Sequence, residues 1–129
     1  MERLALVAIG GGAGAVARYL AGVGYLRAFG TERPWAATLG VNVLGGALMG
    51  VLIATLALRG GEHGERWRLL LGVGVLGGFT TFSTFSLEAV GLLQRRAYGT
   101  AVGYVAASVI LSLVGLWLGL HLTRRVLGS

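Results

Sequence analysis

Residues 74–86 read GVLGGFTTFSTFS and place three glycines and five hydroxyl side chains inside an apolar segment. Such a segment is about as long as a membrane span, roughly 20 residues. In a bilayer every backbone N–H and C=O needs a partner, and an orphan costs on the order of several kcal/mol. A span that breaks its helix at mid-depth must therefore bury the break in protein or line a polar cavity with it, as the ion sites of transport proteins do.

The composition is that of a membrane protein. The chain has 129 residues, 55% of them hydrophobic and only 12% charged, which is about half the charge of an ordinary soluble domain. Its 24 glycines predict closely packed transmembrane helices. There is no cysteine, which excludes disulfides and thiolate sites. The net charge of +6 comes from arginines at the ends of apolar runs, so we expect anchoring at the membrane interface and no nucleic-acid binding.

Four apolar segments predict an all-α integral membrane protein, with a single four-helix domain over residues 1–129. The expected spans cover residues 4–26, 35–58, 69–93 and 100–122, with a break in the third. Each is long enough to cross a bilayer. We interpret the first as a retained span, because Arg18 stands near its end and another span follows directly.

The arginines are divided almost evenly between the two sides of the predicted bundle. Six lie on the side of both termini and the second loop, and four on the other, or five if Arg18 snorkels outward. The positive-inside rule needs a clear bias to fix orientation. The weak bias predicts insertion both ways and hence an antiparallel homodimer. Because one small four-helix chain has little room for an aqueous route, we expect that route between subunits.

The second and third spans carry polar and aromatic residues, each of which has either a structural role or a role in an ion pathway. Asn42 either makes an interhelical hydrogen bond or offers its amide to an anion. Phe82 and Phe85 either pack or present positive ring edges to a small anion, a weak contact that suits rapid transit. The hydroxyls either bond the carbonyls of the preceding turn or form a polar track; they belong to Thr80, Thr81, Ser83, Thr84 and Ser86.

Further candidates lie outside this motif. Glu88 is the only carboxylate within the predicted spans and either pairs with an arginine or sits at a pore mouth. The side chains of Tyr104, Ser108 and Ser112 recur every four residues and share one helix face, directed at another helix or at a cavity. Arg18 is expected to snorkel or to anchor a subunit contact, with attraction of anions as the alternative.

The glycines of the third span bear on a cation site. Residues 74, 77 and 78 allow the backbone to leave helical geometry. Carbonyls freed there, as at Gly77 and Thr80, are hard oxygen ligands. They are able to hold a small cation if two subunits meet at this point.

No enzyme motif is present. The sequence lacks paired acid–base carboxylates, histidines at metal spacing and a phosphate-binding loop. A small multidrug exporter also has four spans, but it needs a carboxylate in its first span, and none lies between Glu2 and Glu32. A non-transporting assembly subunit is the second rival, and it leaves the hydroxyl-rich break unexplained.

The whole chain resembles the Fluc (CrcB) family of fluoride channels. The resemblance rests on residues 11–19 (GGAGAVARY), on Asn42 with its trailing glycines, and on residues 77–86 (GGFTTFSTFS). It implies a dual-topology homodimer with two antiparallel fluoride pores in the bacterial cell inner membrane. The expected role is passive export of cytoplasmic fluoride to reduce its toxicity.

The resemblance also implies roles for single residues. Asn42 would orient the pore phenylalanines and contact the ion, while Phe82 and Phe85 would line each pore. The backbone carbonyls of Gly77 and Thr80 from both subunits would hold a structural sodium ion. Pore-lining or conduction roles would fall to Thr81, Ser83, Thr84, Glu88, Tyr104, Ser108, Ser112 and Arg18.

Overall fold

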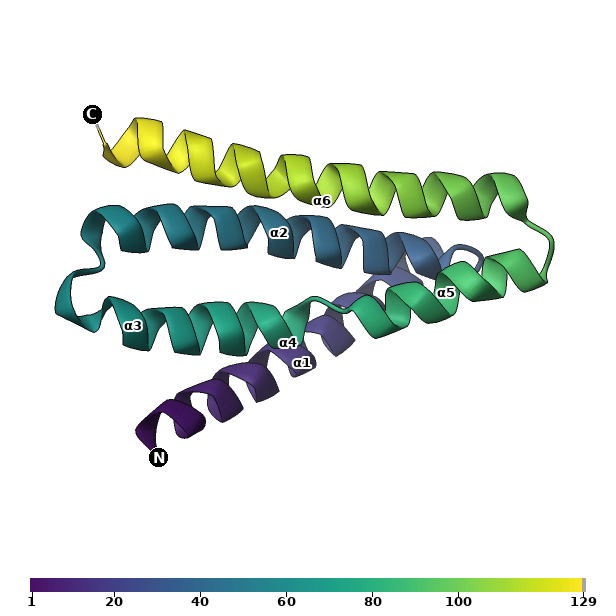
Figure 1. Cartoon of the computed structure of the whole chain (residues 1–129). Coiled ribbons are helices and arrows are strands. Elements are labelled where there is room, and N and C mark those ends of the chain that lie inside the picture. The colour runs from purple at the N-terminus through teal and green to yellow at the C-terminus, as the bar shows by residue number, and fades with distance from the viewer. Residues whose placement is uncertain (129) are drawn as a thin grey trace.

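The computed structural model describes residues 1–128, over which all regular structure is helical (Figure 1). Long helices open and close the chain: α1 covers Glu2–Phe29, α2 covers Pro34–Arg59 and α6 covers Tyr98–Leu127. Between α2 and α6 the chain forms shorter helical pieces, which together make the third segment of the bundle.

The third segment is interrupted where the glycines and hydroxyls predicted a break. Its pieces are η1 (Gly61–His63), α3 (Gly64–Trp67), η2 (Arg68–Leu76), α4 (Gly77–Phe79) and α5 (Phe82–Gln94). The piece η2 is a π-helix, the wider i→i+5 form that often marks functional sites. Thr80 and Thr81 between α4 and α5 have extended backbone, which confirms the predicted break in the third helix.

Among residues 1–128, four helical segments are long and apolar enough to cross a membrane. They cover residues 2–29, 34–59, 61–94 and 98–127, so each extends beyond the predicted span, by one to five residues at most ends and by eight at the start of the third. Glycine and proline set the boundary between the first and second segments. Gly30, with a φ of 87°, ends α1. Pro34 is the first residue of α2, a position at which a backbone N–H would have no partner within the helix. The protein is therefore a multi-pass membrane protein.

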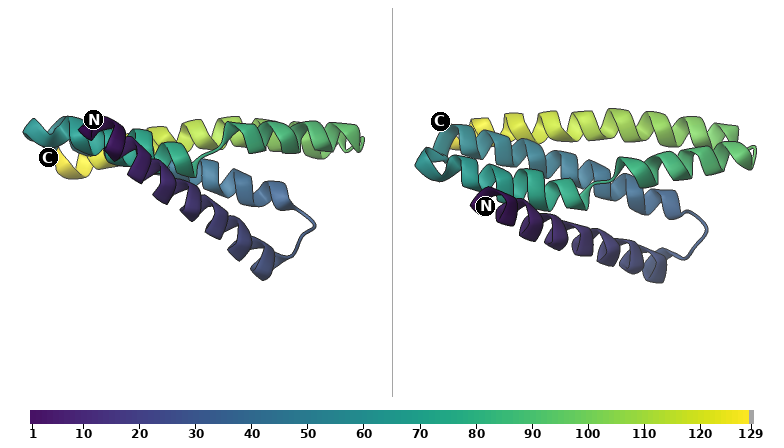
Figure 2. Two further views of the ribbon diagram at one scale, coloured as in Figure 1. Left: turned by 90° about the horizontal axis from the view of Figure 1, so that it is seen from below. Right: turned by 60° about the horizontal axis from the view of Figure 1, so that its bottom comes forward.

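Glycines let α2 and α6 run side by side along most of their length (Figures 1 and 2). A Cβ atom on Gly50 would overlap the carbonyl oxygen of Leu116, and one on Gly119 would overlap that of Ala47. Small residues at helix contacts of membrane proteins permit this approach of backbones.

A second glycine contact fixes α1 beside the break. Helix α1 crosses η2 and α4 obliquely (Figure 2). A Cβ on Gly14 would overlap the carbonyl of Val75, and one on Gly78 would overlap that of Gly11. The middle of α1 therefore touches the backbone directly before the interruption.

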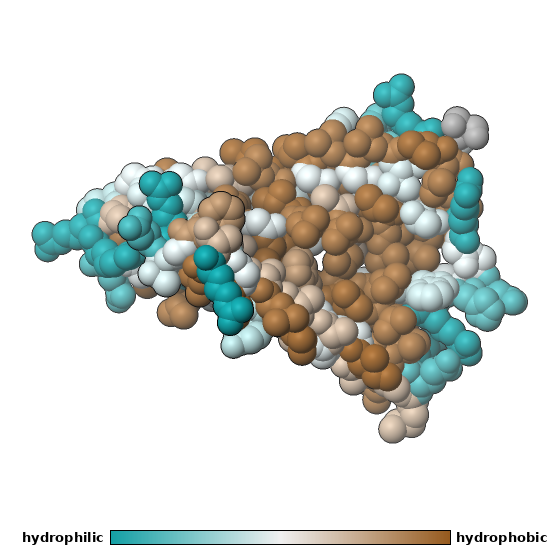
Figure 3. All heavy atoms as spheres, turned by 180° about the vertical axis from the view of Figure 1, so that it is seen from behind, coloured by the Kyte–Doolittle hydropathy of each residue, from teal (hydrophilic) through white to brown (hydrophobic). Residues whose placement is uncertain are grey.

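The surface has the polarity of a protein surrounded by lipid. A broad apolar band separates polar groups at the two ends of the molecule (Figure 3). The buried cluster is small and consists of Ala89, Leu92, Ala101 and Tyr104. Large side chains such as Leu87 and Leu113 remain exposed, which suits contact with acyl chains.

Candidate ion pathway

The break is a two-residue interruption of the helical hydrogen bonds. The N–H of Thr80 still bonds the Leu76 carbonyl at 3.0 Å, but the ψ of Thr80 is 158° and Thr81 has φ −150° and ψ 121°. The chain is then fully extended for one step before α5 begins. Backbone groups that a continuous helix would pair internally must find other partners here.

Asn42 on α2 supplies those partners for Thr81. Its Nδ2 donates to the Thr81 carbonyl at 3.0 Å, and the N–H of Thr81 donates to its Oδ1 at 2.8 Å. The interhelical hydrogen bond predicted for Asn42 is thus present, with the backbone of the break as its partner. The Asn42 amide has a second hydrogen, which no acceptor among residues 1–128 takes, so the prediction that it contacts an anion remains open.

Several hydroxyls of the motif serve the local backbone. Thr81 caps α5, since its Oγ1 accepts from the N–H of Thr84 at 3.2 Å. Thr80 donates to the Leu76 carbonyl at 3.0 Å, and Ser86 donates to the Phe82 carbonyl at 2.9 Å. The predicted continuous polar track along this motif is therefore reduced, because these hydroxyls already have partners.

Arg18 turns inward to the break. Its Nε donates to the Gly78 carbonyl at 3.4 Å, one of the carbonyls that the interruption leaves without a helical donor. This contact favours an anchoring role for Arg18 over snorkelling to the membrane boundary, and its predicted roles in a subunit contact or in attracting anions stay predictions. The arginine distribution is then six against four.

Two other carbonyls at the break stay open. Across the part of the chain that the structure describes, no hydrogen-bond donor reaches the carbonyl oxygens of Gly77 or Thr80. Gly77 lies on the exposed side and Thr80 is half-buried. Carbonyl oxygens that accept no hydrogen bond are the kind of hard oxygen ligand that the predicted sodium site requires.

A groove of about 460 Å³ lies beside the break, and we call it the break groove. Predicted pathway residues from three helices meet in it: Asn42, Thr81, Phe82, Phe85, Ser108 and Ser112. The rings of Phe82 and Phe85 are 5.6 Å apart. Phe82 is 79% exposed, so one wall of the groove is open in a single chain.

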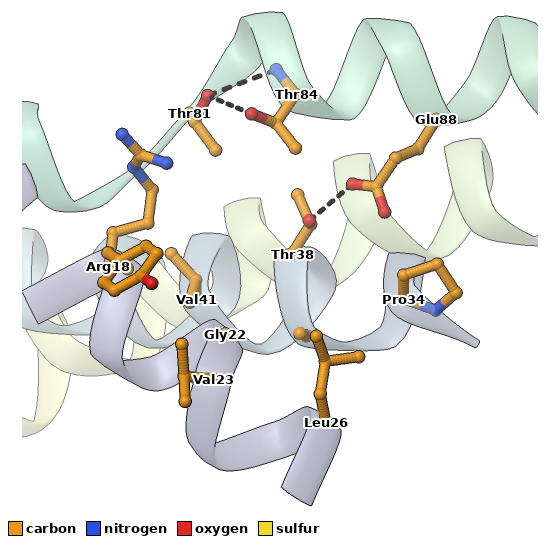
Figure 4. A pocket seen from close by; sticks show the side chains of 12 residues that line it. Arg18, Gly22, Val23, Leu26, Pro34, Thr38, Val41, Thr81, Thr84 and Glu88 are labelled. Carbon is orange, nitrogen blue, oxygen red and sulfur yellow. Dashed lines mark hydrogen bonds between the residues drawn. The ribbon is translucent and has the colours of Figure 1, made fainter. Parts of the chain in front are cut away.

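A second cavity, of about 290 Å³, lies among α1, α2 and α5; we call it the inner cavity (Figure 4). It is lined by Arg18, Thr81, Thr84 and Glu88 from the predicted set, together with Thr38. Thr81 lines both cavities. The two cavities therefore adjoin at the break.

Thr38 is a site residue that sequence reasoning missed. Its hydroxyl donates to the Glu88 carboxylate, so Glu88 pairs with a threonine and with no arginine among residues 1–128. Thr38 precedes Asn42 by four residues and thus shares its helix face. That spacing was the available signal.

Tyr104 and Ser108 on α6 are buried next to this region. Tyr104 is 2% exposed and Ser108 7%, and neither hydroxyl has a hydrogen-bond partner within residues 1–128. The Tyr104 ring packs on Phe85 at 5.2 Å. Buried polar atoms normally have a protein or water partner, so these hydroxyls are available to a water or an ion.

Ser83 does not join the set. It lies on the exposed side of α5 and lines neither the break groove nor the inner cavity. Its neighbours in sequence, Phe82 and Thr84, line one cavity each. Successive residues of a helix point in different directions, and Ser83 is the one of these three that lines neither cavity.

Comparisons with known proteins identify the family of the chain. The family model described as "CrcB-like protein, Camphor Resistance (CrcB)" matches residues 5–120. The "Fluoride-specific ion channel FluC" of Caulobacter sp. (strain K31) is 56% identical over 126 residues, 98% of each chain. The proteins of the same name from Phenylobacterium zucineum and Rhodospirillum centenum are 56% and 53% identical over 98% and 96% of this chain, and 98% and 97% of their own. The chain therefore belongs to the CrcB family.

Proposed function

We propose that this protein is a passive, fluoride-selective ion channel of the bacterial cell inner membrane. The observation that carries the proposal is the break groove, where an amide, two phenylalanine rings and two serine hydroxyls meet beside an interrupted helix. Relatives that are 53–56% identical over nearly the full chain bear the name of a fluoride channel. A channel transports its substrate without catalysis, in keeping with the lack of an enzyme motif.

The groove offers what a dehydrating fluoride ion needs. Hydroxyls of Ser108 and Ser112 and the second hydrogen of Asn42 are donors that replace water. The rims of Phe82 and Phe85 add positive ring edges. Each contact is weak, so the ion enters without being trapped, and a path narrow enough to enforce dehydration excludes the larger chloride.

The groove is proposed to close against a second copy in an antiparallel homodimer. Phe82 is 79% exposed in one chain, so a closed pore wall at this position needs a covering surface from a second copy. The six-to-four arginine distribution favours insertion in both orientations. Two head-to-tail copies would then enclose two pores, one for each break groove.

A structural sodium ion fits the open carbonyls of Gly77 and Thr80. Both belong to a break held in place by Asn42 and Arg18, and both lack donors from residues 1–128. With the same pair from a second copy they would form a set of hard oxygen ligands. When bound, the ion would supply a fixed positive charge between the two chains.

The membrane potential drives the proposed export. Fluoride that enters as neutral HF dissociates in the cytoplasm and is trapped as the anion. A potential that is negative inside favours exit of one charge by about 2.3 kcal/mol per 100 mV. Coupling to another ion is not needed.

Flux from liposomes tests the proposal. Proteoliposomes loaded with fluoride should release it to an electrode when a potassium ionophore balances charge, whereas chloride-loaded vesicles should not release chloride. Movement of chloride or of an organic cation without fluoride would refute the fluoride assignment and favour the exporter. Absence of any flux from folded protein would favour the assembly subunit.

A further inference from the structure

A third cavity, of about 660 Å³, lies at the end of the molecule where α5 turns into α6. Its polar rim contains Arg33, Arg95 and Glu32, and its wall contains Trp35. None of the residues predicted for the ion pathway lines it except Tyr104. Its lining shares no residue with the break groove or the inner cavity, although a smaller pocket lined by Glu88, Trp35 and Arg95 adjoins both it and the inner cavity.

The arginines at this rim are unpaired. The ion pairs among residues 1–128 are Glu62–His63, Glu2–Arg66 and Glu65–Arg68, all toward the opposite end of the bundle. Arg33 and Arg95 are exposed and have no hydrogen-bonded side-chain partner in the part described. The cavity lining thus holds two unpaired arginines and one carboxylate, that of Glu32, and Arg96 follows next in sequence, so the rim attracts anions.

The position of the rim selects the kind of anion. Arg33 directly precedes α2, and Arg95 directly follows α5. Both membrane-spanning segments reach the bilayer boundary here, at the depth of lipid headgroups. Trp35 and the 58% exposed Tyr98 are residue types that gather at that boundary.

An apolar trough continues from the rim along α6. It passes Thr100, Gly103 and Ala107, which recur at intervals of three and four residues and so share one flank of the helix. Val109 and Leu113 line the break groove from a different flank of α6. A second copy that covers the break groove would therefore leave this trough facing lipid.

We propose that this third cavity binds an anionic phospholipid, with the phosphate on Arg33 and Arg95 and the start of an acyl chain in the trough. Free phosphate would bind the arginines but has no apolar part to occupy the trough beneath them. The guanidinium fork suits phosphate oxygens in bidentate contact. This site does not depend on which ion the protein conducts.

Native mass spectrometry of the purified full-length protein, titrated with phosphatidylglycerol or phosphatidylcholine, tests the site. Phosphatidylglycerol should bind more tightly than phosphatidylcholine. The double variant Arg33→Gln/Arg95→Gln should bind phosphatidylglycerol about 30-fold more weakly, as expected for two arginines near an anionic headgroup. The control Arg124→Gln/Arg125→Gln removes the same charge at the other end of α6 and should change this affinity little.

A second pair of variants keeps the arginines. Gly103→Leu places a side chain in the trough, where an added Cβ meets no atom within 4 Å, and Gly99→Leu is a control outside the cavity whose Cβ is equally free of contacts. Gly103→Leu should weaken phosphatidylglycerol binding and Gly99→Leu should not. Equal affinities in all four variants, equal losses in both arginine variants, or inorganic phosphate competing fully at millimolar concentration would overturn the proposal.

Discussion

Asn42 holds both backbone polar groups of Thr81, accepting from its N–H at 2.8 Å and donating to its carbonyl at 3.0 Å. A residue of an adjacent antiparallel strand would make the same two bonds. The side chain therefore substitutes for secondary structure at the single point where the third segment is fully extended. This contact joins the stability of the break to the geometry of the proposed pore.

Asn42→Asp tests this double role. The carboxylate still accepts from the Thr81 N–H but repels the Thr81 carbonyl and any anion in the groove. We expect fluoride flux to fall by at least about tenfold, since lost hydrogen bonds to charged groups cost about 1.5–3 kcal/mol. The measurement is electrode-detected efflux from proteoliposomes with equal protein content. Unchanged flux would assign Asn42 to packing alone.

The location of the break was predictable, whereas its partners were not. Glycines before a hydroxyl cluster indicate where a helix can be interrupted within one segment. The hydrogen-bond partners of the interrupted backbone come from other helices. Asn42 lies 39 positions from Thr81 in sequence, and Arg18 lies 60 positions from Gly78. Such pairings depend on how helices pack, which spacing within one helix does not encode.

The face that α5 presents to the cavities was only partly predictable, since Phe82, Ser83 and Phe85 were all expected in the pathway and Ser83 lines neither cavity. A helix that restarts after extended residues has a rotational phase set by the φ and ψ of those residues. Thr81 determines that phase here, so Phe82 and Phe85 line the groove and Ser83 does not. The four spans, in contrast, follow from hydropathy alone; their ends lie beyond the predicted ones, most of all at the start of the third segment, which begins at residue 61 and not at 69.

Phe82→Ile should slow fluoride efflux without unfolding the protein. The ring supplies a positive edge to the groove that a branched aliphatic side chain lacks. Because Phe82 is 79% exposed in one chain, its replacement removes little packing within that chain. Efflux and thermal unfolding are measured on the same preparation, with Leu87→Ile on the same helix as an exposed control. A loss of stability as large as the loss of flux would show that the ring acts in packing.

Gly14→Ala should destabilise the protein, because the added Cβ overlaps the Val75 carbonyl where α1 crosses the segment before the break. Overpacking of this kind costs about 1–3 kcal/mol. Gly12→Ala on the same helix is the control, since a Cβ there meets no atom within 4 Å. Thermal unfolding in detergent should separate the two variants, and equal transition temperatures would show that α1 is not fixed by this contact.

Thr38 and Glu88 join α2 to α5 through one hydrogen bond in the inner cavity, so their effects on stability should not add. Thr38→Val leaves the carboxylate without its donor, and Glu88→Gln weakens the bond by removing the charge. In a double-mutant cycle we expect a coupling energy of about 0.5–3 kcal/mol between them. Chemical unfolding of both single variants and the double variant gives this value, and Thr38→Ser, which keeps the hydroxyl, should retain most of the wild-type stability. Additive losses would mean that the two side chains act independently, and α5 would then depend on Thr81 and Asn42 for its position beside α2.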